Sequence, residues 1–133
     1  MHAKSTFEVK GWDEKTTSEA PEGEGKITRA SVHFAYHGDL EGEGAMEYLM
    51  VYGEGGSAIV IGLERITGTL GGKRGSFVLK HDGGYAAGVA KGEFSIVDGS
   101  GTGELKGITG DGRTMAEHEG AMTAELEYEL APA

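Results

Sequence analysis

The segment Ser57–Asp82 constrains the fold more than any other part of the chain, because it has the pattern of two long strands joined at Gly71-Gly72. Apolar and polar residues alternate on both sides of these glycines. A two-residue type I′ turn needs positive φ at both central positions, which glycine supplies. Such a turn predicts the cross-strand pairs Ile66–Phe77, Glu64–Leu79 and Gly62–His81 on one face. A three-residue loop would reverse the parity and turn Glu64 outward.

The rest of the chain continues in alternating segments without helical periodicity. Further strands are expected at Phe7–Trp12, Lys26–His37, Ala45–Tyr52, Tyr85–Val97, Arg113–His118 and Ala121–Leu130. Connections are expected at Asp13–Gly25, Gly38-Asp39, Gly53–Gly56, Gly83-Gly84, Asp98–Gly112 and Glu119-Gly120. Roughly eight strands with short turns predict an all-β fold, a single closed eight-stranded antiparallel β-barrel spanning residues 1–133. Closure would remove exposed strand edges.

Charge and composition exclude several classes of function. The net charge is −10, and Lys73-Arg74 is the only adjacent pair of basic residues. Nucleic acids and anionic membranes both need clustered Lys and Arg, so neither is expected as a partner. Cysteine is absent, which excludes disulfides and thiolate chemistry. The N-terminus lacks an apolar signal segment, and the longest apolar run, Ala58–Leu63, is too short to span a bilayer, so we expect a cytoplasmic protein.

Glu64 and His81 form the most suggestive chemical pair in the sequence. In the predicted register they are diagonal neighbours on one face, with Cα atoms about 7–8 Å apart. A carboxylate among apolar side chains is a candidate general base, and Gly62 would leave room for the imidazole ring or a ligand. Tyr48 is the first choice among the inward tyrosines to hydrogen-bond a carbonyl or enolate. A buried structural pair is the competing interpretation.

A ligand in the lumen would be lined by residues from several strands. The candidate ligand-binding residues are Gly62, Met50, Phe77, Leu79, Gly88, Ala90, Phe94, Arg113, Glu117 and Tyr128. The small face Ala86, Gly88, Ala90 and Gly92 favours unfilled space. Arg113 and Glu117 are predicted to share the inward face of the last hairpin, where Arg113 could hold a carboxylate. An ion pair at the barrel rim is the alternative.

No metal or cofactor is expected. His33 and His37 have the spacing of a metal pair on a helix, but on a strand they lie roughly 13 Å apart. The chain has no complete dinucleotide or P-loop fingerprint and no nucleophile elbow, since position 98 is Asp where the elbow needs Gly.

Three functions remain open. The first is binding of one small, mainly apolar or carbonyl-containing molecule in the lumen. The second is a cofactor-free isomerase, cyclase or lyase with Glu64 as general base and His81 and Tyr48 as orienting groups. The third is a structural or oligomerisation module, in which the outward apolar row Ile59, Ile61 and Leu63 forms a homodimer interface.

An ordered series of short segments carries a family resemblance over nearly the whole chain. The segments are Phe7–Glu14, Glu47–Met50, Gly62–Arg65, Thr67–Gly72, Gly75–Leu79 and Gly99–Leu105. They resemble the mainly bacterial domain-of-unknown-function family 3224. The resemblance implies a small eight-stranded antiparallel barrel like that of allene oxide cyclase, whose relatives include plant allene oxide cyclase and bacterial natural-product cyclases. It transfers no catalytic residue, and fold alone does not establish activity.

Overall fold

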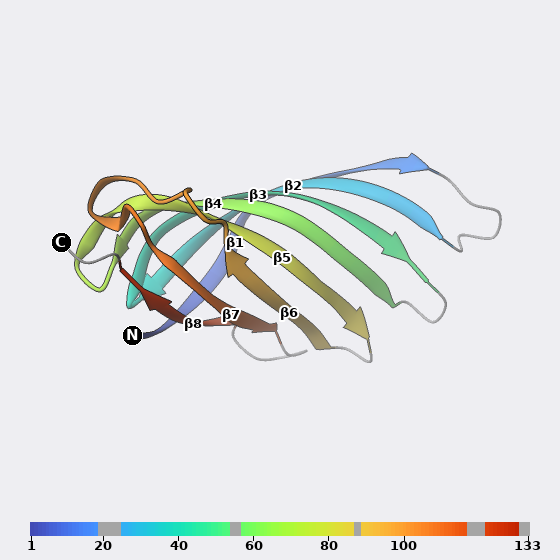
Figure 1. Cartoon of the computed structure of the whole chain (residues 1–133). Coiled ribbons are helices and arrows are strands. Elements are labelled where there is room, and N and C mark those ends of the chain that lie inside the picture. The colour runs from blue at the N-terminus through green and yellow to red at the C-terminus, as the bar shows by residue number, and fades with distance from the viewer. Residues whose placement is uncertain (19–24, 54–56, 87–88, 117–121, 131–133) are drawn as a thin grey trace.

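A computed structural model shows a closed antiparallel barrel in which each strand pairs with its neighbours in sequence and β1 pairs with β8 (Figure 1). It describes residues 1–18, 25–53, 57–86, 89–116 and 122–130. The strands are β1 (His2–Ser18), β2 (Lys26–Gly38), β3 (Leu40–Tyr52), β4 (Ala58–Leu70), β5 (Lys73–Ala86), β6 (Val89–Ile96), β7 (Thr109–Ala116) and β8 (Met122–Glu129), with a short 3-10 turn, η3 (Gly103–Leu105), before β7. The predicted eight-stranded all-β barrel is therefore confirmed.

The β4–β5 hairpin has the register that the sequence predicts. Leu70 pairs with Lys73 across a two-residue turn, and the three predicted cross-strand pairs all form. Gly71 and Gly72 have φ values of 59° and 84°, the left-handed conformation that a type I′ turn requires. Glu64 and His81 consequently both lie on the inner face of the barrel.

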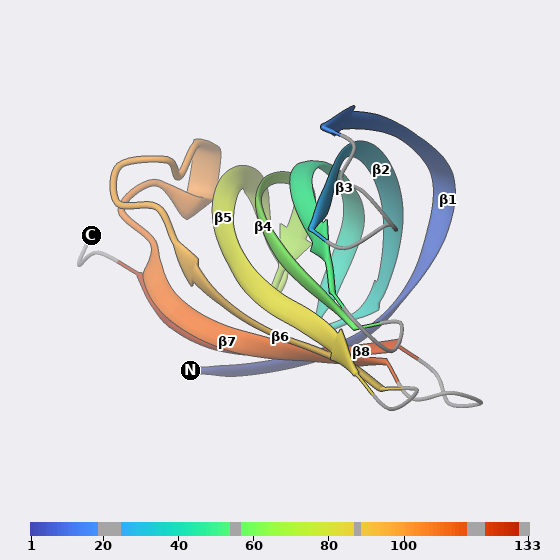
Figure 2. The ribbon, with the colours of Figure 1, turned by 90° about the vertical axis from the view of Figure 1, so that its right-hand side faces the viewer.

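The two ends of the barrel differ because its strands differ in length. Strands β1–β5 have 13 to 17 residues, whereas β6, β7 and β8 have 8 each. Within the described residues, strand β1 pairs with β8 through His2–Phe7 and continues along β2 as far as Ser18. The long strands therefore extend beyond the short ones at what we call the flared end, toward which Figure 2 looks. The opposite end, which holds the β2–β3 and β4–β5 turns, is the closed end.

A continuous apolar core fills the closed end. Its largest fully buried side chains include Phe77, Ile66, Leu70, Leu105 and Ile108, the last two from the segment around η3. Thr102 and Ser100 fix this segment to β5, since their hydroxyls accept hydrogen bonds from the amides of Ser76 and Val78. The segment thereby forms the base of the core.

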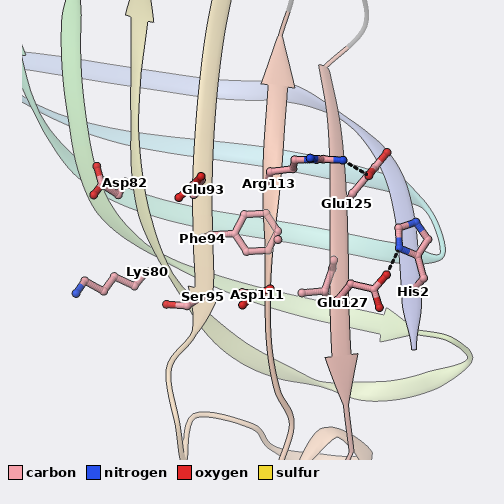
Figure 3. A pocket seen from close by; sticks show the side chains of 12 residues that line it. His2, Lys80, Asp82, Glu93, Phe94, Ser95, Asp111, Arg113, Glu125 and Glu127 are labelled. Atoms are coloured by element: carbon pink, nitrogen blue, oxygen red, sulfur yellow. Dashed lines mark hydrogen bonds and ion pairs between the residues drawn. The ribbon is translucent and has the colours of Figure 1, made fainter.

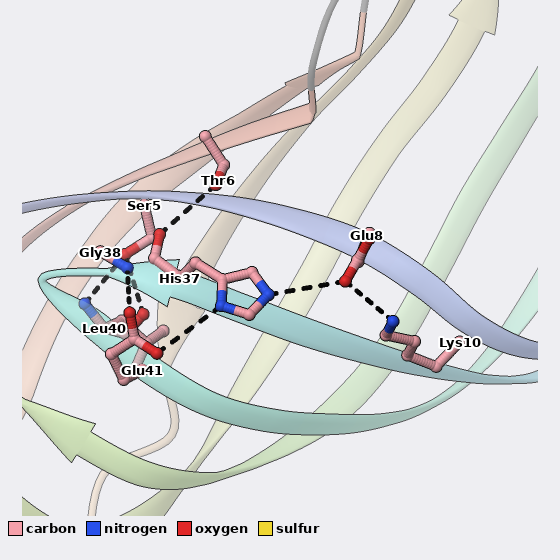
Figure 4. Close-up of polar contacts among 8 residues, drawn as sticks. All are labelled: Ser5, Thr6, Glu8, Lys10, His37, Gly38, Leu40 and Glu41. Atoms are coloured by element: carbon pink, nitrogen blue, oxygen red, sulfur yellow. Dashed lines mark hydrogen bonds and ion pairs between the residues drawn. The ribbon is translucent and has the colours of Figure 1, made fainter.

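Polar contacts hold the β2–β3 turn against β1 at the same end (Figure 4). The Ser5 hydroxyl accepts a hydrogen bond from the Leu40 amide and donates one to the Leu40 carbonyl, at 2.9 and 3.2 Å. The Gly38 amide donates to Glu41 at 2.8 Å. His37 lies between the carboxylates of Glu8 and Glu41, at 3.5 and 3.6 Å. The backbone amides of Gly38 and Leu40 at this tight turn therefore both have hydrogen-bond acceptors.

Strand boundaries differ from the prediction where glycines and bulges interrupt the alternation. The predicted turn at Gly83-Gly84 is wrong, because both residues lie inside β5. Gly83 pairs with Gly92, and a Cβ at Gly83 would lie 2.6 Å from the Lys91 carbonyl oxygen. These glycines allow two strands to approach closely, which the sequence pattern does not distinguish from a turn.

The predicted connection Asp13–Gly25 is also partly wrong, because β1 continues to Ser18. Irregular pairing at Val9/Gly11 shifts the parity of β1, so that Trp12 and Glu14 share the inner face with Phe7. A period-two pattern does not reveal the irregularity after Val9, because it assumes that every residue keeps its place in the alternation.

The predicted connection Asp98–Gly112 is also partly wrong, because it contains η3 and the start of β7.

Candidate functional site

A buried polar triad joins three strands between the two halves of the barrel. The Tyr36 hydroxyl donates to Glu64 Oε2 at 2.5 Å, and His81 Nε2 lies 2.7 Å from Glu64 Oε1. Glu64 is fully buried, Tyr36 is 3% exposed, and the His81 side chain retains 11% of its surface. Both carboxylate oxygens are engaged, so a ligand can reach only His81 among the three.

Tyr36 reaches Glu64 across an intervening strand. Tyr36 lies on β2 and Glu64 on β4, while Gly44 of β3 lies between them. A Cβ at Gly44 would overlap the Glu64 carboxylate and would lie 3.0 Å from the Tyr36 ring. Glycine at this buried position therefore makes the Tyr36–Glu64 contact possible.

The hydrogen bonds of the triad indicate which of its groups donate and which accept. An ionised carboxylate can only accept, so His81 bonds to an ionised Glu64 through Nε2–H and keeps the Nδ1 lone pair when the ring is neutral. Burial, together with the charge and hydrogen bond of Glu64, raises the pKa of Tyr36 well above its ordinary value. Tyr36 therefore stays protonated and donates throughout the physiological range. The His81 ring also contacts Phe94, with centroids 5.5 Å apart.

A second polar cluster lies on the inner face of the flared end. Glu14 Oε2 accepts hydrogen bonds from Thr28 and Tyr52 at 2.6 and 2.5 Å, and Glu14 Oε1 accepts one from Trp12 Nε1 at 3.2 Å. The Lys26 ammonium lies 5.0 Å from the centroid of the Tyr52 ring, which is a cation–π contact. These contacts fix the side chains along the rim of the flared end.

The protonation of this cluster follows from its contacts. Burial raises the pKa of Glu14, but the hydrogen bonds from Thr28, Tyr52 and Trp12 outweigh it, and the net pKa is lowered. The hydrogen bond to Glu14, followed by burial, raises the pKa of Tyr52. Glu14 is thus an anion and Tyr52 a neutral donor at neutral pH.

Tyr48 lies beside this cluster on the same inner face. Its ring packs edge-on against Trp12 at 5.5 Å, and only 7% of the residue is exposed. Burial, followed by the charge of Glu14, raises its pKa, so the hydroxyl keeps its proton. Among the described residues, none forms a hydrogen bond with that hydroxyl. Tyr48 is therefore a protonated donor at neutral pH.

The apolar surroundings of Tyr48 complete the inner face of the flared end. Ala30, Val32 and Met46 are buried beside it, and Met50 and Val60 are half-buried. Trp12 is 50% exposed although it faces inward. The face thus combines aliphatic and aromatic surface with the hydroxyl of Tyr48.

The described residues of the closed half pack closely around the lumen. A cavity of about 10 Å³ remains between Tyr36, Ile66, Phe77 and Leu79, which is about the space of one water. Four predicted ligand residues, Phe77, Leu79, Phe94 and Tyr128, belong to this packed core. Gly62 provides no space either, because a Cβ there would overlap Tyr48 and the Glu47 carbonyl. Met50, another of the predicted ligand-binding residues, lies at the flared end.

The prediction that Arg113 faces inward is wrong. Arg113 pairs with Glu125, and its neighbour Thr114 pairs with the inward residue Ala124, so the register is one residue away from the one that would turn Arg113 inward. Its guanidinium lies outside, 3.3 Å from the Glu125 carboxylate. Ala90 lies on β6 opposite Tyr85, whereas Gly88, Glu117 and the predicted turn at Glu119-Gly120 lie outside the described residues.

Arg113 lines a concavity of about 770 Å³ on the outer wall of β5–β8 (Figure 3). Its ionisable lining residues are His2, Lys80, Asp82, Glu93, Asp111, Arg113, Glu125 and Glu127. His2 and Arg113 are each paired with a glutamate on the adjacent strand β8. Within the described ranges, no three His, Asp or Glu side chains are arranged to hold a metal ion, and no helix could cross a membrane.

Comparison with known proteins decides the family. The profile of a family described as "Protein of unknown function (DUF3224)" matches residues 3–128. This chain belongs to the DUF3224 family. A crystal structure of a DUF3224 protein of unknown function from Shewanella oneidensis MR-1 is similar over 100% of this chain and 98% of that one, with a TM-score of 0.86 and 27% identity. No curated protein matches the sequence.

Several residues of this DUF3224 site were not predicted as site residues from the sequence. The sequence does not indicate the contact of Tyr36 with Glu64, because this contact crosses a strand and depends on Gly44. Glu14 falls in a predicted connection, because the irregularity after Val9 hides its inward position. The only available signal was the pair of glycines Gly42 and Gly44 on the inward positions of β3.

Proposed function

We propose that this DUF3224 barrel binds one small, mainly apolar molecule against the inner face of its flared end. The observation that carries the proposal is the contrast between the two halves. In the closed half, the described residues leave a cavity of about 10 Å³ beside Leu79, whereas the flared end leaves Trp12 50% exposed beside Tyr48. Exposed aromatic surface next to a polar handle is typical of small-molecule sites.

The polar groups favour a ligand that carries a carbonyl or another acceptor. The raised pKa of Tyr48 keeps its hydroxyl protonated, so it can donate. The ionised Glu14 at the rim, together with the net charge of −10, disfavours an anionic ligand. Met50 and Val60 would contact the apolar part of the molecule, since methionine adapts to irregular shapes.

Fluorescence tests this proposal directly, because Trp12 is the only tryptophan in the chain. The probe is N-phenyl-1-naphthylamine, a neutral apolar fluorophore whose binding near Trp12 quenches indole emission. We expect saturable quenching in the wild type and at least a tenfold loss of affinity in Met50→Glu. Met115→Glu, the same substitution at an exposed outer position, should bind normally.

One further variant separates the flared end from the outer surface. Ile61→Glu alters the exposed outer face of β4 and should leave probe binding unchanged. Equal probe affinity in the wild type and Met50→Glu would contradict the proposal. Loss of binding in Ile61→Glu alone would place the probe on the outer face of β4 instead. Circular dichroism melts of each variant confirm that the barrel is folded.

A second candidate function is proton transfer at His81, in a cofactor-free isomerase or lyase. The geometry favours a different assignment from the one expected from sequence, because Glu64 is fully buried with both oxygens engaged. His81 would be the general base through Nδ1, and Glu64 would be the positioning residue that fixes its ring.

The tautomer of His81 tests this candidate. In ¹⁵N NMR spectra of the neutral ring, we expect the proton on Nε2 in the wild type and a mixture of tautomers in Glu64→Ala. A proton on Nδ1 in the wild type would remove the only lone pair available for catalysis and end this assignment.

A further inference from the structure

We infer that the outer face of β3 and β4 is an interface for a second copy of this chain. Five large aliphatic side chains form a contiguous surface there, which we call the β3–β4 patch: Leu49, Val51, Ile59, Ile61 and Leu63. Their exposed fractions are 44%, 40%, 63%, 53% and 55%. Within the patch, Val51 pairs directly with Ile59 and Leu49 with Ile61.

The size of the patch indicates a binding surface. Contiguous apolar patches of about 300–600 Å² are the largest that monomers normally expose, and they are often functional. Five aliphatic side chains left roughly half exposed fall within this class.

The charges around the patch fit a second copy better than an anionic partner. Four charged residues lie directly opposite patch residues on neighbouring strands, two of each sign: Arg29 and Lys80, and Glu47 and Asp82. The chain as a whole carries −10, so this surface is locally balanced in an otherwise acidic protein. Balanced charge relieves the repulsion that two copies would otherwise experience.

The arrangement of these charges is self-complementary under a twofold axis. Arg29, Leu49, Ile61 and Asp82 lie in one row across β2, β3, β4 and β5. An axis parallel to the strands, between β3 and β4, brings each Arg29 opposite Asp82 of the second copy. An isologous interface needs this symmetry, in which residue i meets j and j meets i. The two faces would pack as sheet on sheet, with side chains interdigitating.

Sedimentation equilibrium on the full chain tests the interface. We expect a dimer in the wild type at roughly 100 μM and at least a tenfold rise in the dimer dissociation constant for Ile61→Glu. Met115→Glu, at an exposed outer position on β7, should leave the constant unchanged. A wild type that remains monomeric, or a dimer unaffected by Ile61→Glu, would overturn the inference.

Charge reversal tests the orientation of the two copies. Arg29→Asp and Asp82→Arg should each weaken the dimer, and the double variant should restore it, because the two charges are exchanged together. A double variant no tighter than the single ones would overturn the twofold arrangement. A monomeric wild type that binds neutral phosphatidylcholine vesicles, and loses them in Ile61→Glu, would assign the patch to a lipid surface instead.

Discussion

Tyr36 donates a hydrogen bond to Glu64 from a strand that is not its neighbour in the barrel. The 2.5 Å bond crosses β3 above Gly44 and lies between the packed closed end and the apolar cluster of the flared end. A fully buried carboxylate is tolerated only when its oxygens are hydrogen-bonded. The stability of the barrel should therefore depend on this contact.

Replacing Tyr36 with Phe should lower the free energy of unfolding by about 1.5–3 kcal/mol at pH 7, because Glu64 loses a buried donor. The difference should narrow above pH 10. The fold raises the pKa of Tyr36, so above its ordinary value of 10.0 the unfolded chain loses the proton first and wild-type stability falls. Urea denaturation between pH 7 and 11 measures both effects. A constant difference across this range would show that Tyr36 does not titrate in this way.

A methyl group at Gly44 should destabilise the barrel without changing its charge. Gly44→Ala would press against the Glu64 carboxylate, at a typical overpacking cost of about 1–3 kcal/mol. Gly11→Ala is the matched control, because its new Cβ would lie 3.7 Å from the nearest atom, an ordinary contact. Chemical denaturation compares the two. Equal stability of both variants would mean that Gly44 is not needed for the triad.

The Glu14 side chain should stabilise the barrel only at pH values at which its carboxylate is ionised. Its pKa is lowered in the fold, so the contribution is present above the ordinary value of 4.5 and is lost as the pH falls through the lowered pKa. Because Glu14 is only partly buried, we expect an effect below about 1 kcal/mol. Glu14→Gln should unfold at lower temperature than the wild type at pH 7, and the two should converge near pH 3. Glu43→Gln, at an exposed position on β3, should behave like the wild type at both pH values.

Removing a side chain from the closed end should leave an apolar void. Leu79 is 3% exposed and lines the remaining cavity, so Leu79→Ala should lower stability by about 2–5 kcal/mol. Met115→Ala, on the outer surface, should cost far less. Pressurised xenon should bind the Leu79 variant and not the wild type, as measured by ¹²⁹Xe NMR. Xenon binding by the wild type would show that the closed half is not filled.

The sequence predicts the strands best where period-two alternation is unbroken. The hairpin around Gly71-Gly72 illustrates this, since one turn determines the pairing of Glu64 and His81. The errors occur where one residue changes the parity. The irregularity after Val9 hides Glu14, and the register of β7 and β8 turns Arg113 outward. The Tyr36–Glu64 contact could not be predicted, because pairing rules describe adjacent strands and this contact skips one.

The unequal strand lengths imply that the two ends of the barrel open with different free energies. Beyond Phe7, β1 pairs with β2 alone within the described residues, so its amides from Val9 to Ser18 lie at the margin of the sheet. Such segments exchange their amide hydrogens through local fluctuations, whereas the closed end should exchange only when the whole domain unfolds. The flared end is therefore the part of the molecule that can yield to an incoming ligand while the closed end stays folded.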